Sequence, residues 1–140
     1  MGTRSTITFC EKIDDKIIPY VNRYLEGVGK ELCEWLEDKI IVNGFSPGDR
    51  RDIANGVGCL VAQFISDKKN GVGDFYVYPI GEGNGYCDYN YTVIIDETYS
   101  ERKLKDITTI EVGNWGNKPF FKGTIQELLD YIENQKEEDA

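Results

Sequence analysis

Histidine is absent from this chain of 140 residues. Because imidazole is the usual general base near neutral pH, its absence excludes Ser-His-Asp and Cys-His catalysis and every zinc site that contains histidine. The chain also lacks a GxxxxGK[ST] loop, which excludes a P-loop nucleotidase. No set of residues names a reaction, so we expect a protein that is not an enzyme and that uses no cofactor or metal.

Basic residues are scarce as well: 16 Lys and Arg stand against 25 Asp and Glu, for a net charge of −9. Since binding to DNA or RNA by counterion release needs a basic surface, we expect no nucleic-acid partner. A small anion held by a few arginines is still compatible with this charge. The chain has no apolar run near the roughly 20 residues of a membrane helix and no apolar stretch of signal-peptide type at its start. We therefore expect a cytoplasmic protein without a membrane partner.

Four cysteines are present, and no two of them form a CxxC pair: Cys10, Cys33, Cys59 and Cys87. Each lies in a separate predicted element, which favours reduced, buried thiols. A zinc site built from four distant cysteines is the alternative.

The pattern of apolar residues predicts one α+β domain at residues 1–134, followed by an acidic tail at 135–140 that frays. We expect an antiparallel sheet of five to six strands packed by two to three helices, in the order β-β-α-α-β-β-β-β-α. Alternation predicts strands at residues 5–10, 16–24, 74–80, 86–96, 104–112 and 119–121. Helical spacing predicts helices at residues 30–39, 47–69 and from 124 onward.

Several local signals refine this prediction. The first two strands form a hairpin, in which Pro19 indicates a free side or a bulge. Strands 74–80 and 86–96 pair across the glycine-rich loop at 81–85. Thr124 and Glu127 form a capping box that opens the last helix. Gly56 and Gly58 each cost the central helix about 0.5–1 kcal/mol relative to alanine, which indicates either tight packing against the sheet or the close approach of a ligand.

Tyrosine is abundant, with nine in the chain, and five of them lie in the predicted second hairpin: Tyr76, Tyr78, Tyr86, Tyr89 and Tyr91. Tyrosines that face each other across strands pack well, with roughly 0.2–1 kcal/mol per pair. The functional interpretation is a platform for stacking a base, worth about 1–3 kcal/mol per base.

The few arginines suit phosphate recognition, because a planar guanidinium binds phosphate through two hydrogen bonds. Arg4 stands at the mouth of the first predicted strand and Arg23 lies among tyrosines, whereas Arg50 and Arg51 sit at the start of the predicted central helix. Ordinary surface ion pairing is the other interpretation, and it is favoured for Arg50 and Arg51.

Five segments together resemble a group of small bacteriophage proteins that open with Gly-Thr-Arg-Ser. They are residues 2–9 (GTRSTITF), 24–29 (YLEGVG), 53–63 (IANGVGCLVAQ), 75–79 (FYVYP) and 123–128 (GTIQEL). The resemblance covers most of the chain and specifies a relationship, not an activity. Many of these proteins carry a His/Arg-Gln-Tyr/Phe-Asp-Gly-Tyr run where residues 20–27 (YVNRYLEG) stand here. Any chemistry that used a histidine there is lost, which favours binding over catalysis.

A phage context implies, by analogy, the counter-defence sponges of the anti-CBASS and anti-Thoeris type, which sequester nucleotide immune signals between subunits. The expected function is therefore phage-type immune evasion in the host cytosol. In it, a homo-oligomer, a dimer or tetramer, binds a cyclic dinucleotide or a cyclic ADP-ribose isomer without catalysis. The expected ligand contacts are arginines for phosphate, tyrosines for stacking, and a backbone turn for polar contacts: Arg4 and Arg23; Tyr20, Tyr24, Tyr76 and Tyr78; Asn55 and Gly56.

Two other functions stay open. One is a protein–protein inhibitor of a host defence enzyme that acts through an acidic surface. The other is a hydrolase that relies on carboxylates and a divalent metal, since 25 acidic residues offer many pairs of carboxylates.

Overall fold

In the residues that it describes, the computed structural model has four helices and two sheets, which confirms the α+β class. It describes residues 4–13, 16–26, 29–44, 48, 50–71, 76–78, 89–96, 101–114 and 118–139. Several predicted features lie outside these ranges: Asp14 and Asp15, Ser46 and Pro47, the loop at 81–85, Tyr86 and Cys87.

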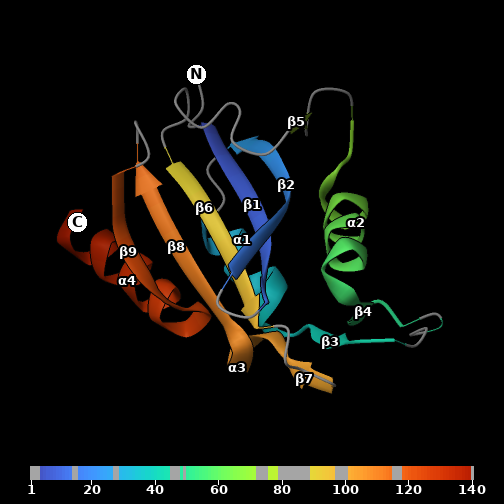
Figure 1. Cartoon of the computed structure of the whole chain (residues 1–140). Helices are drawn as coiled ribbons and strands as arrows, with labels where there is room; N and C mark the ends of the chain where they lie inside the picture. The colour runs from blue at the N-terminus through green and yellow to red at the C-terminus, as the bar shows by residue number, and fades with distance from the viewer. Residues whose placement is uncertain are drawn as a thin grey trace.

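The main sheet has six strands in the order β5-β2-β1-β6-β8-β9 (Figure 1). Its strands are β1 (Arg4–Ile13), β2 (Lys16–Glu26), β5 (Tyr76–Tyr78), β6 (Tyr89–Asp96), β8 (Thr108–Asn114) and β9 (Lys118–Thr124). The predicted hairpin of β1 and β2 is confirmed. Its register slips between Phe9 and Cys10, which leaves Tyr20 as the extra residue beside Pro19 and confirms the bulge.

The predicted tyrosine hairpin is wrong. Strand β5 pairs with β2 at the edge of the sheet, whereas β6 pairs with β1 and β8, so two strands separate β5 from β6. Residues 79–88 separate β5 from β6 in the sequence, and a glycine-rich sequence does not require a tight turn. Because of this crossover β6 runs parallel to β1, so the sheet is not entirely antiparallel as predicted.

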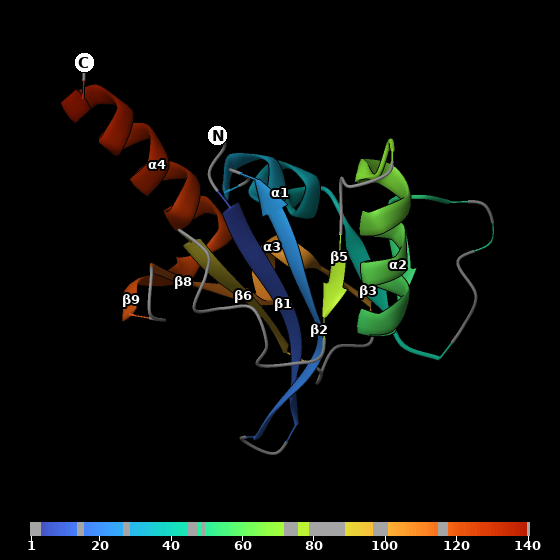
Figure 2. The ribbon, with the colours of Figure 1, turned by 90° about the horizontal axis from the view of Figure 1, so that it is seen from above.

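Three helices cover one face of the main sheet: α1 (Gly29–Glu37), α2 (Gly56–Lys68) and α4 (Ile125–Asp139). Figure 2 shows α1 and α4 on the same side of the strands. Helix α2 joins them through Phe64, whose ring lies 5.8 Å from that of Phe9 on β1. Three apolar residues of α1 are buried, namely Leu32, Trp35 and Leu36. We call this side of the sheet the core face; it carries Ile7, Phe9, Tyr91, Val93, Ile110 and Val112.

A second, smaller sheet was not predicted, and it shortens the central helix. It has the order β4-β3-β7, with β3 (Ile40–Val42), β4 (Ile53–Asn55) and β7 (Glu101–Lys103). The prediction of a helix over 47–69 is therefore wrong before Gly56, where a φ of +82° marks a backbone turn that favours glycine. The apolar spacing wrongly extended the predicted helix to Ile53, because this residue is buried in strand β4 just as it would be in a helix.

The other corrections are local. A short helix, α3 (Leu104–Ile107), replaces the first half of the strand predicted at 104–112. Tight packing does not explain Gly58, because a Cβ at this position meets nothing within 4 Å among the described residues. Helix α4 ends at Asp139, within the segment 135–140 that was expected to be an acidic tail. No helix in the described part of the chain has the length and apolarity needed to cross a membrane.

Candidate functional site

The main sheet carries a continuous line of polar positions on the face opposite the core face. Residues that pair directly across neighbouring strands share one face of a sheet. The register links Tyr78 to Asn22, Asn22 to Thr8, Thr8 to Thr92, Thr92 to Glu111 and Glu111 to Lys122. We call this line the central polar row. At about 4.8 Å per strand its five steps span about 24 Å, which is ample for a nucleotide.

A second line runs beside the central polar row, two residues away along each strand. It links Tyr76, Tyr24, Thr6, Asn90 and Gly113. Thr6 and Asn90 are buried, and the Thr6 hydroxyl donates to Asn90 Oδ1 at 2.6 Å. Asn90 Nδ2 in turn donates to the carbonyl of Asn114 at 3.4 Å. These two hydrogen bonds link β1, β6 and β8 next to the central polar row.

We call the side of the sheet that carries these two rows the polar face. The described side chains of the two rows are Thr6, Thr8, Asn90, Thr92, Glu111 and Lys122. Thr8, Thr92 and Glu111 are half-buried and Lys122 is exposed, so part of the central polar row is accessible to a ligand. None of the described helices lies over this face (Figures 1 and 2).

The structure brings together three of the predicted ligand residues and separates others. Tyr24 stands opposite both Thr6 and Tyr76, and Tyr78 stands opposite Asn22, so all three tyrosines take positions on the polar face. Arg4 belongs to the same face by register, at the start of β1 opposite Glu26. Tyr20 is the extra residue of the bulge and has no register partner on β1.

Arg23 does not share this face. It stands opposite Ile7 on one side and Val77 on the other, and Ile7 belongs to the core face. The two arginines expected to share a phosphate are therefore on opposite faces of the sheet. Sequence reasoning could not see this, because the face of a strand residue depends on register and not on composition.

Asn55 and Gly56 lie away from the main sheet, at the junction of β4 and α2. The Asn55 side chain accepts a hydrogen bond of 3.0 Å from the backbone N–H of Gly44. Asn55 makes no side-chain cap to α2, and Gly56 supplies the positive φ of the turn. The bond between Asn55 and Gly44 ties the end of β4 to the chain just after β3.

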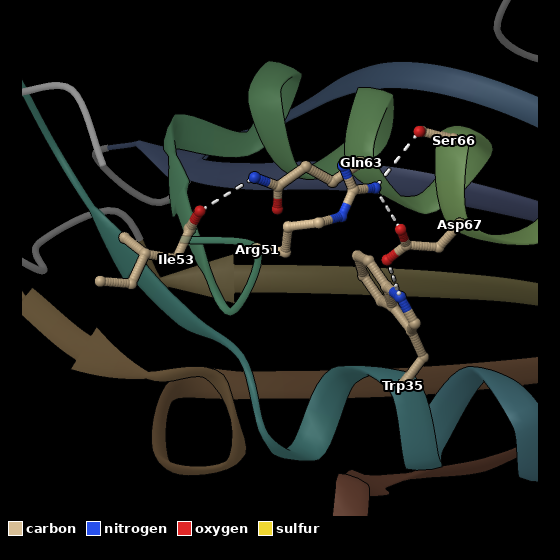
Figure 3. A network of polar contacts seen from close by, with 6 residues as sticks. All are labelled: Trp35, Arg51, Ile53, Gln63, Ser66 and Asp67. Carbon is tan, nitrogen blue, oxygen red and sulfur yellow. Dashed lines mark hydrogen bonds and ion pairs between the residues drawn. The ribbon is translucent and has the colours of Figure 1, made fainter. Parts of the chain in front are cut away.

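Arg50 and Arg51 form ion pairs, as the sequence favours. Arg50 donates to Asp52 through Nε at 3.1 Å and through Nη2 at 2.7 Å. Arg51 bonds to Asp67 of α2 and, at 3.2 Å, to the hydroxyl of Ser66. Asp67 also accepts from the indole of Trp35 at 2.8 Å, so one carboxylate joins α1, α2 and the turn before β4 (Figure 3).

Figure 3 also shows Gln63, whose Nε2 donates to the carbonyl of Ile53 at 2.9 Å. This bond ties α2 to β4. Its other amide atom, Oε1, is buried and makes no hydrogen bond to any residue that the structure describes. The Gln63 amide therefore donates one hydrogen bond through Nε2, whereas its acceptor Oε1 has no partner among the described residues.

Aromatic rings form a cluster between the end of the main sheet and α4: Tyr89, Tyr91, Phe120, Phe121 and Tyr131. Tyr89 is 39% exposed and Phe120 is 42% exposed, and their ring centroids are 6.3 Å apart in an edge-to-face arrangement. This cluster lies on the core side of the sheet, so it is separate from the polar face.

The thiols of Cys10 and Cys33 are free and buried, and Cys59 is free and half-buried. Burial raises the pKa of Cys10 to about 11. Burial, with nearby Glu37 and Glu34, raises the pKa of Cys33 to about 12. In the described part of the chain, no three Cys, Asp or Glu residues stand close enough to hold a metal ion.

Comparisons with models of protein families, with curated proteins and with solved structures found no match for this chain.

Sequence reasoning missed the described residues at the centre of the polar face. Thr92, Glu111 and Lys122 look like ordinary solvent-facing positions of three separate strands. The available signal was alternation, since Thr92, Glu111 and Lys122 each have apolar neighbours on both sides or one side in sequence. Only the pairing of β6, β8 and β9 shows that Thr92, Glu111 and Lys122 are neighbours across the sheet.

Proposed function

We propose that this chain binds and sequesters a small cyclic nucleotide signal on the polar face, without converting it. The ligand is a cyclic dinucleotide or a cyclic ADP-ribose isomer, and the biological role is phage-type immune evasion in the host cytosol. The observation that carries the proposal is the central polar row, in which all six strands contribute a phenol, amide, hydroxyl or charged group at one register level.

The chemistry of the polar face suits a nucleotide better than it suits a purely apolar ligand. Phenol rings at Tyr24, Tyr76 and Tyr78 supply π faces for stacking a base. The Thr92 hydroxyl both donates and accepts hydrogen bonds, so it fits a sugar or a base edge. Arg4, at the end of the same face, carries a guanidinium suited to phosphate.

We further propose that two or more copies close on the ligand. One sheet face contacts only one side of a molecule, whereas tight small-molecule sites bury 70–90% or more of the ligand surface. A second copy supplies the missing cover, and a homodimer or homotetramer with closed symmetry provides it.

Calorimetry with a panel of cyclic dinucleotides and cyclic ADP-ribose isomers tests the proposal. We expect at least one ligand to bind in the micromolar range or tighter and to be recovered intact after the protein is heat-denatured. Thr92→Leu places apolar bulk in the middle of the row and should abolish that binding. The matched control is Ala62→Leu, which adds bulk on the exposed side of α2. No binding of any ligand in the panel would sink the proposal, and recovery of a converted product would favour the carboxylate hydrolase.

The aromatic cluster favours a second candidate, a protein–protein inhibitor of a host defence enzyme. Exposed aromatic rings are enriched at protein interfaces. Phe120 and Tyr89 are both exposed, and the Phe120 ring also lies 6.1 Å from that of Tyr131 on the acid-rich helix α4. In that case no nucleotide should raise the melting temperature, a pull-down should recover a basic host protein, and Phe120→Ser should abolish the recovery.

A further inference from the structure

Glu111 and Lys122 stand directly opposite each other on β8 and β9, at one end of the central polar row. Glu111 is half-buried and Lys122 is exposed. Nevertheless, no ion pair joins them, and neither side chain forms a hydrogen bond or an ion pair with any other residue that the structure describes. A half-buried carboxylate beside an ammonium group, with neither engaged by the other, leaves an acceptor and a donor ready for an external partner.

We propose that this pair reads the Watson–Crick edge of a guanine base in the bound nucleotide. The inference rests on the proposed function and adds the identity of the base. An ionised carboxylate only accepts hydrogen bonds and an ammonium group only donates them. Guanine presents two adjacent donors, N1–H and the N2 amino group, followed by the acceptor O6. Glu111 accepts from both donors and Lys122 donates to O6, a contact typical of lysine with guanine.

Geometry supports the match. Opposite residues on neighbouring strands have Cβ atoms about 4.5–5.5 Å apart, so their end groups reach neighbouring positions on one base edge. Thr92 stands on the other side of Glu111 and limits the direction in which the base can lie. Adenine offers a single donor beside its ring acceptor, so the carboxylate gains one hydrogen bond instead of two.

The test compares three ligands by calorimetry: cyclic di-GMP, cyclic di-AMP and cyclic di-IMP, whose base lacks the N2 amino group. We expect the wild-type protein to bind cyclic di-GMP at least about tenfold more tightly than either of the others, the difference that one good hydrogen-bonded pair supplies. Glu111→Gln keeps the side-chain size but replaces one of the two acceptor oxygens with an NH2 group, which cannot accept a hydrogen bond from guanine. It should lower the affinity for cyclic di-GMP about tenfold and change that for cyclic di-AMP by less than about twofold.

Glu133→Gln, an exposed carboxylate on α4, is the control for the change in charge and should leave all three affinities unaltered. Melting temperatures of both variants verify that they fold. Equal binding of the three ligands to the wild-type protein, or equal weakening of all of them by Glu111→Gln, would overturn the assignment of guanine while the proposed function stands. Failure of every cyclic nucleotide to bind would overturn both.

Discussion

The indole nitrogen of Trp35 donates a hydrogen bond of 2.8 Å to the carboxylate of Asp67, which joins α1 to the end of α2. Trp35 is only 9% exposed, and Lys39 lies over its ring at 4.7 Å. Arg51 binds the second oxygen of the same carboxylate. Asp67 stands in the last turns of α2, where the helix dipole disfavours a negative charge, so these partners must compensate for its position.

Asp67→Ala should therefore destabilise the protein. The substitution leaves the Trp35 N–H without its partner in a partly buried site, which costs about 1–3 kcal/mol. Urea unfolding at neutral pH measures the loss. Asp106→Ala is the matched control, because Asp106 is exposed in α3, and it should change stability by less than about 0.5 kcal/mol. Equal effects of the two substitutions would show that the Trp35–Asp67 bond does not stabilise the fold.

The same carboxylate should make stability depend on acid. Burial works to raise the pKa of Asp67, but hydrogen bonds from Arg51 and Trp35 and the charges of Arg51 and Lys39 outweigh it and lower the pKa. A carboxylate with a lowered folded-state pKa stabilises the protein above its ordinary value of about 4, and this contribution is lost as the pH falls through the folded-state value. The stability difference between wild type and Asp67→Asn should thus shrink below about pH 4. A difference that stays constant from pH 7 to pH 3 would contradict this pairing.

Gly29 and Tyr91 provide a test of close packing. A Cβ at Gly29 lies 2.7 Å from the Tyr91 hydroxyl oxygen, which is closer than real contacts allow. Tyr91 is buried, so Gly29→Ala should cost about 1–3 kcal/mol through overpacking. Removing the hydroxyl by Tyr91→Phe should relieve most of that cost, and the double-mutant cycle measured by chemical denaturation reports the coupling. Additive effects would argue against the contact.

Gly58→Ala is the matched control for Gly29→Ala. A Cβ at Gly58 meets nothing within 4 Å in the described part of the chain. Since this position is in α2, alanine should stabilise the protein by about 0.5–1 kcal/mol. Destabilisation instead, together with a change in assembly size by light scattering, would mean that a partner copy packs against this helix.

How far the fold can be predicted depends on whether the signal is local. The capping box needs only residues 124–127, and both of its reciprocal bonds form: Thr124 N–H to Glu127 at 3.0 Å and Glu127 N–H to the Thr124 hydroxyl at 3.1 Å. The bulge at Pro19 follows from one missing N–H. Strand partners are not local, because alternation around Tyr76 is the same whether the strand pairs with β6 or with β2.

The candidate site was accessible to prediction only in part. Tyr24, Tyr76 and Tyr78 were singled out by residue type, and register then placed them on one face. Arg23 was chosen by the same reasoning but falls on the core face, because neighbours in sequence point to opposite sides of a strand. Glu111 was missed because an acidic residue in an acidic chain carries no signal of its own until Lys122 is known to stand opposite.

The cap itself supplies a prediction about α4. Thr124→Ala removes the hydroxyl that accepts the Glu127 N–H, and should cost about 1 kcal/mol. Thr124→Ser keeps the hydroxyl and should restore most of the loss. Urea unfolding compares the two variants, and equal destabilisation by Ala and Ser would show that the methyl group of Thr124, rather than its hydroxyl, stabilises this end of α4.

Thiol reactivity offers a direct test of the core. Since only the thiolate reacts with alkylating reagents, a pKa of about 11 leaves about a thousandth of Cys10 reactive at pH 8, compared with about a quarter of an ordinary thiol. Cys33, whose pKa is about 12, should react still more slowly, and both are buried. We expect iodoacetamide to modify half-buried Cys59 well before either of them in the folded protein, and all three at similar rates in urea. Peptide mass spectrometry after timed labelling gives the rates. Labelling of Cys10 as fast as that of Cys59 in the native protein would contradict the placement of β1 at the centre of the sheet.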